Sequence, residues 1–238
     1  NKLSHSELMS VINEIGMIPE SIEASSTEEK LFSKASDCVL AKALSELGLK
    51  SAVSQERSNS ADIIATSVYH GYSLVADAKT FRLSRTAKNQ KDFKISTLSN
   101  WRGSEHDFAL LVAPYFQYPK SSSQIYSSAL DHEVCLISWE HILFLLENEI
   151  TETPDFSLES IWSAATRIAR NKKLAYADRM NCHLPDVDEF VYTRIGKTQE
   201  DFMDFLIKCK SCIIDRGNSE VVFLNQECQK VKKLTREE

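Results

Sequence analysis

The sequence predicts an α/β fold followed by a helical C-terminal part. Apolar runs of strand length, from Phe108 to Ala113 and from Val134 to Ile137, stand among helical patterns up to about residue 150. From Thr151 onward the patterns are helical, and the one strand-like run there extends from Glu220 to Leu224. The 238 residues, of which 42% are hydrophobic and 26% charged, suffice for a sizeable core.

Two helices are expected before the first strands. Ser4 and Glu7 have the spacing of a capping box, and apolar residues follow them at helical intervals. Ser26 and Glu29 repeat this spacing ahead of a longer helix, and Gly48 marks its end.

We divide the chain into an α/β core, residues 1–150, and a helical part, residues 151–238. Helices of the second part are expected to begin near Asp155 or Ser157, at Asp186 and at Thr198. The sequence leaves open whether this part is a true domain or a helical extension packed on the sheet.

Charge and hydropathy exclude several classes of protein. A formal net charge of −6 argues against a basic coat and leaves room only for a local basic site. No run approaches the length of about 18 apolar residues that a membrane helix needs, and no secretory signal is recognisable. We therefore expect a cytoplasmic protein with no membrane partner.

The six cysteines are scattered, which favours a reducing cytosol over a disulfide framework. Cys209 and Cys212 have metal-like spacing, and Cys182 with His183 is a conceivable second pair for zinc. These residues lie in helix-like sequence without a glycine knuckle, so buried or free thiols are the preferred interpretation.

Acidic residues stand beside two apolar β-type runs, Ser60 to Ala65 and Leu74 to Lys79. On a strand, Asp77 and Lys79 point the same way because side chains alternate between the two faces. One surface therefore presents a carboxylate and an ammonium group together.

The turn between these runs, Val68 to Tyr72, is short enough for a hairpin. A two-residue loop at positions 69–70 would place Asp62 opposite Asp77, and one at positions 70–71 would place it opposite Lys79. Either register gathers the three side chains on one face. Two carboxylates and an ammonium group suit a hard divalent cation and the water that it activates.

A helix, a strand with Asp and a strand with Asp-x-Lys follow one another as in the PD-(D/E)xK nucleases, with Ser-Ala-Asp in place of Pro-Asp. Three longer stretches resemble the HindIII-type restriction endonucleases of that superfamily: Ser26 to Ala35, Leu74 to Lys94 and Ala113 to Pro119. The resemblance covers about Ile18 to Leu146.

This resemblance implies a nuclease core over residues 1–150, with a mixed central sheet flanked by helices. It implies a bacterial, homodimeric type II restriction endonuclease that needs Mg²⁺ and cuts both strands of a short palindromic double-stranded DNA site. The implied site is AAGCTT, cut after the first adenine. By matching positions, Asp62 and Asp77 bind metal and Lys79 is catalytic. The backbone carbonyl of Ala78, which lies between Asp77 and Lys79 in the sequence, is a candidate for a further metal ligand.

Glu29 is a candidate for a fourth catalytic residue, because related folds often supply another acidic group from a preceding helix. Its other explanation is the capping box that begins with Ser26.

A basic segment follows the Asp-x-Lys strand. Between Lys79 and Lys94, six basic residues face one acidic residue, whereas the whole chain is acidic. Such a segment binds phosphates, and its bidentate groups could read guanine or adenine edges. A solvated basic loop is the alternative. The candidate DNA-binding residues are Arg82, Ser84, Arg85, Lys88, Asn89 and Gln90.

Two other functions stay open at this point. One is a PD-(D/E)xK nuclease of DNA repair or recombination, which would recognise branched or damaged DNA. The other is a non-catalytic DNA-binding protein of the same fold.

Overall fold

The computed structural model describes residues 3–54, 61–85, 90–120 and 122–234. Its elements, in chain order, are α1 (His5–Ile15), α2 (Thr27–Glu46), β1 (Leu49–Val53), β2 (Ile63–Ser67), β3 (Ser73–Ala78), α3 (Gln90–Phe93), α4 (Ile95–Arg102), β4 (Phe108–Ala113), the 3₁₀ turn η1 (Tyr115–Gln117), α5 (Gln124–Asp131), β5 (Val134–Ser138), α6 (Trp139–Glu147), α7 (Glu159–Trp162), α8 (Ala164–Ala169), α9 (Tyr176–Arg194) and α10 (Gln199–Lys233).

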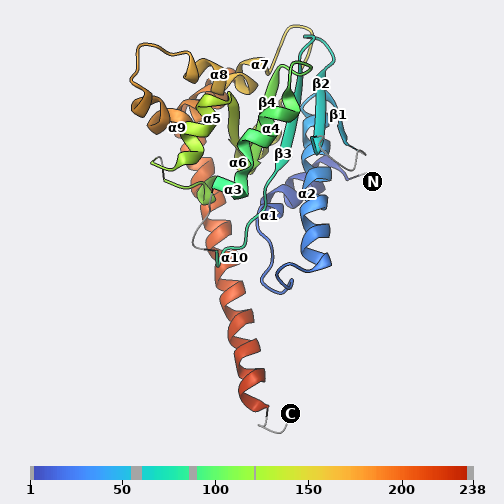
Figure 1. Ribbon diagram of the computed structural model, residues 1–238. Helices are drawn as coiled ribbons and strands as arrows, with labels where there is room; N and C mark the ends of the chain where they lie inside the picture. Colours follow the sequence, from blue (N-terminus) through green and yellow to red (C-terminus); the bar gives the residue numbers. More distant parts are fainter. Residues whose placement is uncertain (1–2, 55–60, 86–89, 121, 235–238) are drawn as a thin grey trace.

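The five strands form one mixed sheet in the order β1-β2-β3-β4-β5 (Figure 1). β1, β2 and β3 are antiparallel neighbours, whereas β3, β4 and β5 run parallel. The change of direction occurs at β3, so this strand lies between both kinds of partner. The predicted α/β class, with a mixed sheet, flanking helices and a helical C-terminal part, is confirmed.

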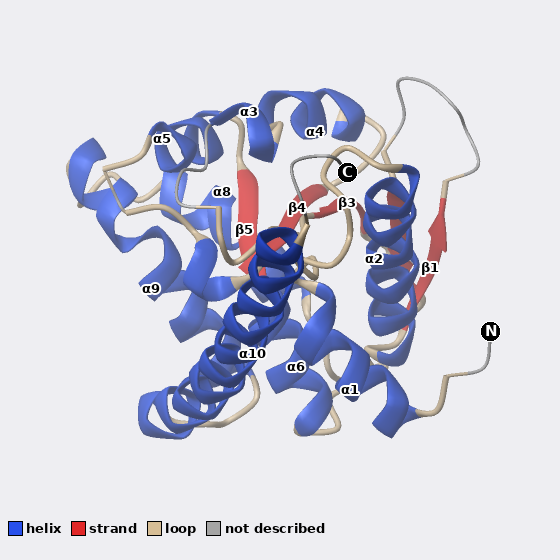
Figure 2. Ribbon diagram, turned by 90° about the horizontal axis from the view of Figure 1, so that it is seen from below, coloured by secondary structure: helices blue, strands red, loops and turns tan. Residues whose placement is uncertain are grey.

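Helices cover both faces of the sheet, as the view from below shows (Figure 2). The two faces are separated by strict alternation along the strands. On β4, Leu110 and Val112 pack in the larger core with α1, α2 and α6. Ala109 and Leu111 pack in the smaller core with α4 and α5. Both faces of β4 are therefore buried, as expected for a strand in a parallel region.

Several local predictions are confirmed. Ser4 and Glu7 form a reciprocal capping box, and Ser26 caps α2 through the Glu29 backbone N–H. Gly48 follows α2 with φ +92°, the left-handed conformation that favours glycine. The predicted strands became β4 and β5, and Ser138 caps α6.

The hairpin has the first of the two predicted registers. Ile63 pairs with Ala76 and Ile64 with Val75, so continuing the register outward sets Asp62 opposite Asp77. The predicted two-residue loop was wrong, because Ser67 and Tyr72 make the last ladder hydrogen bond and four residues connect them. The longer loop has the same centre as the predicted one, so the residues that pair across the two strands are unchanged.

The predictions for the second half were less accurate. Residues 220–224 are helical and continue α10, so the predicted strand was wrong. α9 begins at Tyr176 and includes Pro185, so Asp186 does not start a helix. The helix expected near Asp155 or Ser157 is two short helices, α7 and α8. β1 was not predicted. In the described residues, no helix is both long and apolar enough to cross a bilayer.

Glu152 joins the helical part to the hairpin. Its side chain is buried and accepts hydrogen bonds from Ser67 Oγ at 2.7 Å, from the Leu158 backbone N–H at 2.7 Å and from the Tyr72 hydroxyl. Trp162 Nε1 donates to the same hydroxyl at 2.9 Å. Burial, reinforced by the Glu152 hydrogen bond, raises the pKa of Tyr72, which therefore remains a donor.

We propose that residues 151–238 are a helical extension that folds together with the sheet. Replacing Glu152 with Ala should lower the free energy of unfolding by about 3 kcal/mol, because three buried donors lose their acceptor. Urea unfolding followed by circular dichroism measures this change. Exposed Glu159 is the control, and Glu159→Ala should change stability by less than about 0.5 kcal/mol. Two separate unfolding transitions in the unmodified protein would contradict the proposal.

Candidate active site

Asp77 and Lys79 lie at the carboxyl end of β3, where the backbone is held from two sides. The Lys79 backbone N–H donates to the Val112 carbonyl at 2.7 Å, and Trp139 Nε1 donates to the Lys79 carbonyl at 3.0 Å. The two side chains share one side of the strand and form an ion pair. This pair fixes the ammonium group beside a buried carboxylate.

Asp62 immediately precedes β2. Its carbonyl accepts a hydrogen bond at 2.9 Å from the backbone N–H of Ser54, which extends the β1–β2 pairing to this residue. The hairpin register brings its carboxylate to the same end of the sheet as that of Asp77. The sequence therefore placed these two carboxylates correctly relative to each other.

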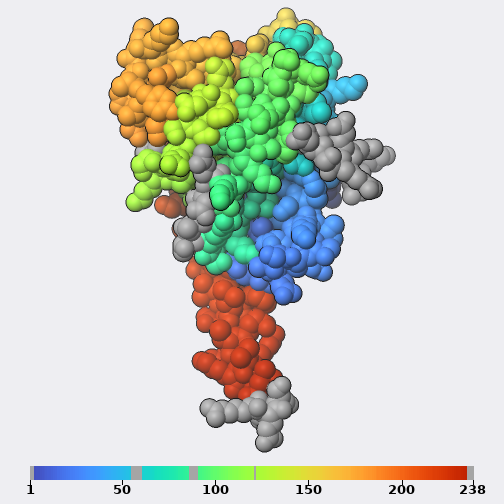
Figure 3. Space-filling model, in the orientation of Figure 1, coloured from blue at the N-terminus to red at the C-terminus, as the bar shows by residue number. Residues whose placement is uncertain are grey.

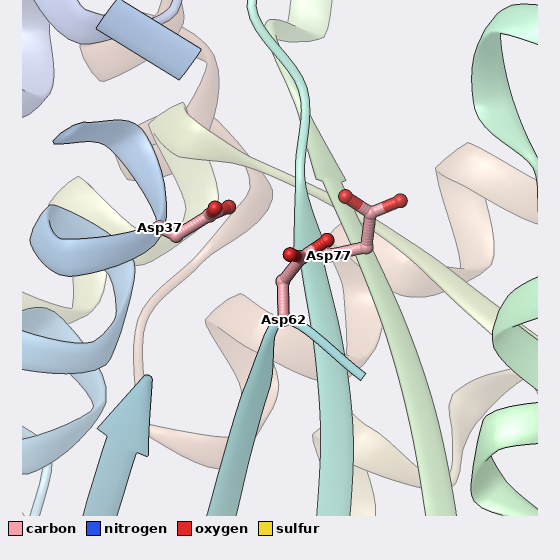
Figure 4. A group of neighbouring side chains, drawn as sticks. All are labelled: Asp37, Asp62 and Asp77. Carbon is pink, nitrogen blue, oxygen red and sulfur yellow. The ribbon is translucent and has the colours of Figure 1, made fainter. Parts of the chain in front are cut away.

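A third carboxylate, Asp37, comes from the middle of α2 and was missed by the sequence analysis. It is only 4% exposed and points from the helix toward Asp62 and Asp77 (Figure 4). Its signal in the sequence was a charge at an apolar position, since Asp37 lies three and seven residues before buried Leu40 and Leu44. Recognising its function required knowing which strand end the helix contacts.

The three carboxylates lie close enough to bind one cation. An oxygen of each lies within 4.8 Å of an oxygen of the other two. Burial raises the pKa of Asp77, although Lys79 opposes this effect, and burial raises the pKa of Asp37 to about 6. Burial thus disfavours the ionised forms of Asp37 and Asp77, and positive charge nearby stabilises them.

Lys34 supplies part of that charge. Its Nζ lies 3.1 Å from Asp37 Oδ2 and also forms an ion pair with Asp62. Burial lowers the pKa of Lys34, but the hydrogen bonds and attraction of Asp62 and Asp37 outweigh it and raise the pKa. A protonated amine thus stands between two of the three carboxylates.

The donor set suits a hard divalent cation, because all three side chains offer carboxylate oxygens. Among the described residues, no other group of His, Cys, Asp or Glu has metal-binding geometry. The zinc alternative therefore has no support, and all six cysteines are free thiols.

The cluster lines a cleft of about 600 Å³. Its charged walls carry six basic and four acidic side chains: Lys30, Lys34, Lys79, Arg85, Lys91, Lys94, Asp37, Asp62, Asp77 and Asp92. Basic walls around an acidic centre fit a polyanion that is bound together with a cation.

Comparison with known proteins identifies the family. Residues 2–238 match the family described as HindIII restriction endonuclease. The chain is 43% identical over 238 residues to the Type II restriction enzyme HindIII of Haemophilus influenzae, covering 100% of this chain and 78% of that protein. The chain belongs to the HindIII restriction endonuclease family. Its enzyme class is site-specific endonuclease, and DNA binding is part of that class.

Within this restriction endonuclease, Glu29 lies outside the carboxylate cluster. Its Oε1 accepts from Arg82 Nε at 3.1 Å and Nη2 at 2.9 Å, and its Oε2 accepts from the Ser25 backbone N–H at 2.6 Å. The Ser25 hydrogen bond, with help from Arg82, lowers the pKa of Glu29. Its contacts are those of a structural ion pair.

The DNA-binding residues predicted from the sequence fall into three groups. Arg82 is largely enclosed and also donates to the Pro19 carbonyl at 3.1 Å, while the Ser84 backbone N–H donates to Glu20 at 3.2 Å. Arg85 lines the cleft and pairs with Asp92 at 2.7 Å. The structure does not describe Lys88, Asn89 or the side chain of Gln90, which begins α3.

Lys34 pairs with two carboxylates that a divalent cation would bind, so its removal should strengthen metal binding. Lys34→Met should bind Mn²⁺ about 5- to 10-fold more tightly than the unmodified protein without DNA, as measured by isothermal titration calorimetry. Lys30 lines the same cleft, and Lys30→Met should leave the affinity within about twofold. Equal or weaker binding by Lys34→Met would refute competition.

Proposed function

We propose that the protein is a homodimeric type II restriction endonuclease of the bacterial cytoplasm that requires Mg²⁺. It cuts both strands of double-stranded AAGCTT after the first adenine by phosphodiester hydrolysis. The observation that carries this proposal is the convergence of three aspartates and Lys79 in a basic cleft of a HindIII-family chain. Family membership favours it over a repair nuclease or a non-catalytic DNA-binding protein.

Asp62 and Asp77 would hold the cation, with Asp37 and the carbonyl of Ala78 as further ligands. Bound Mg²⁺ supplies a water of lowered pKa and neutralises phosphate charge. Lys79 lies next to these ligands through its pair with Asp77. Its ammonium group donates hydrogen bonds to the attacking water and to a phosphate oxygen, where negative charge develops in the transition state.

DNA contacts are divided along the segment after β3. Arg85, Lys91 and Lys94 line the cleft and bind phosphates. Lys88, Asn89 and Gln90 have the groups that read guanine and adenine edges. Arg82 and Ser84 act on DNA through the position of this segment, which they anchor to Glu20 and Glu29.

Asp37, and not Glu29, is the fourth catalytic residue in this proposal. This assignment is supported by its position in the cluster and by the separate ion pair of Glu29 with Arg82. Glu29 is then a positioning residue, because it holds the start of the basic segment.

Cleavage of a fully sequenced linear plasmid, with mapping of the ends, tests the function. We expect discrete fragments that end at every AAGCTT site in Mg²⁺ and no cutting in EDTA. Asp77→Ala and Lys79→Ala should each lower the rate at least about 1,000-fold while duplex binding persists, because charge stabilisation of the transition state is lost. Full activity in both variants would remove these residues from the active site.

Paired substitutions separate the roles of Asp37 and Glu29, which both lie on α2. Asp37→Asn should lower the cleavage rate about 100-fold and weaken Mn²⁺ binding measured without DNA, because it removes a carboxylate ligand. Glu29→Gln should leave Mn²⁺ affinity unchanged and weaken duplex binding. The reverse pattern would favour Glu29 over Asp37 as the fourth catalytic residue.

A further inference from the structure

The second half of α10 leaves the body of the molecule as an arm. Near its start the helix packs on the core through Phe202, Phe205, Leu206 and Cys209. Farther along, Arg216 pairs with Glu14 at 3.6 Å and Glu220 accepts from the Glu20 backbone N–H at 3.1 Å. Beyond these contacts the helix projects below the body, as the ribbon and the space-filling view both show (Figures 1 and 3). A helix of 35 residues is about 52 Å long, because each residue adds about 1.5 Å.

A stripe of exposed apolar side chains follows this helix at coiled-coil spacing. Ile207, Ile214 and Val221 are seven residues apart and are 61%, 53% and 57% exposed. Leu224 and Val231 are also seven apart and are 42% and 65% exposed. Together they occupy the two heptad positions that form the seam between paired helices, where Lys210, Gly217 and Cys228 also lie. We call these five residues the α10 seam.

Charge selects the orientation of a pairing helix. The first two turns of α10 carry Glu200, Asp201 and Asp204, with Lys208 and Lys210 following them, whereas the last turn carries Lys230, Lys232 and Lys233, with Glu227 before them. An antiparallel copy of the same helix sets each acidic end beside a basic end, and two-fold symmetry makes this contact twice. A parallel copy would set like charges together at both ends.

We propose that the α10 seam binds the α10 seam of a second copy of this chain in antiparallel orientation. The inference rests on the proposed homodimer and assigns its interface. Ile207 then packs on Val231 of the partner subunit, and Ile214 packs on Leu224 of the partner subunit. In the same register, Asp204 flanks Lys232 of the partner subunit.

Gly217 supplies an independent argument. Glycine inside a helix costs about 1 kcal/mol relative to alanine, so its presence needs a reason. Within the described chain, a methyl group there would come no closer than 3.9 Å to Leu83, so the subunit's own packing has room for it. In the antiparallel register Gly217 faces Val221 of the partner subunit near the two-fold axis, where a missing side chain lets the helices approach closely.

Sedimentation equilibrium of the full chain without DNA tests the seam. The unmodified protein should be a dimer, and Ile214→Lys should raise its dissociation constant at least about 100-fold by placing a charge in an apolar contact. Ser219 is exposed on the opposite side of the helix, and Ser219→Lys should leave the constant within about threefold. Circular dichroism checks that both variants keep their helix content.

A charge exchange tests the orientation. Asp204→Lys and Lys232→Asp should each raise the dissociation constant about tenfold, and combining them should restore it to within about threefold. A monomeric unmodified protein, a dimer indifferent to Ile214→Lys, or a failure of the double variant to recover would each overturn the proposal. Plasmid cleavage is measured separately. Cleavage without a seam-dependent dimer would contradict only the α10 seam, whereas a seam-dependent dimer that does not cleave would contradict only the proposed endonuclease activity.

Discussion

The antiparallel pairing of β2 with β3 is the constraint on which the site depends. It sets Asp62 opposite Asp77 at one end of the sheet, against the mutual repulsion of two carboxylates. The fold tolerates this pairing because ammonium groups stand beside it: Lys79 pairs with Asp77, and Lys34 pairs with Asp62. A shift of one residue in this register would turn the acidic side chain of one strand away from that of the other.

The rest of the structure makes that register rigid and completes the site. The Val112 carbonyl of β4 accepts a hydrogen bond from the Lys79 backbone N–H, and Trp139 of α6 donates one to the Lys79 carbonyl. These two bonds fix the backbone just after Asp77. Glu152 secures the far end of the hairpin to the helical part. α2 packs along the antiparallel strands and delivers Asp37 to the cluster. Helices and strands from much of the chain thus hold the three carboxylates in position.

The parts of the site that the sequence predicted are those set by local rules. The period of two along a strand placed Asp77 with Lys79, and hairpin pairing added Asp62. Asp37 could not be found this way, because its role depends on how α2 docks against the sheet. Glu29 was a candidate because related folds often supply an acidic group from a preceding helix, but a distant partner, Arg82, binds its side chain. The same limitation explains α9, since packing overrides the helix-breaking tendency of Pro185.

In the proposed active site, one cation is held by carboxylates from α2, the residue before β2 and the end of β3. A crystal structure of the protein soaked in Mn²⁺, with anomalous diffraction measured at the manganese edge, tests it most directly. We expect an anomalous peak coordinated by Asp62 and Asp77 on the side that faces Asp37. A peak at Glu29, or full manganese occupancy at a place that Asp77 does not reach, would contradict it.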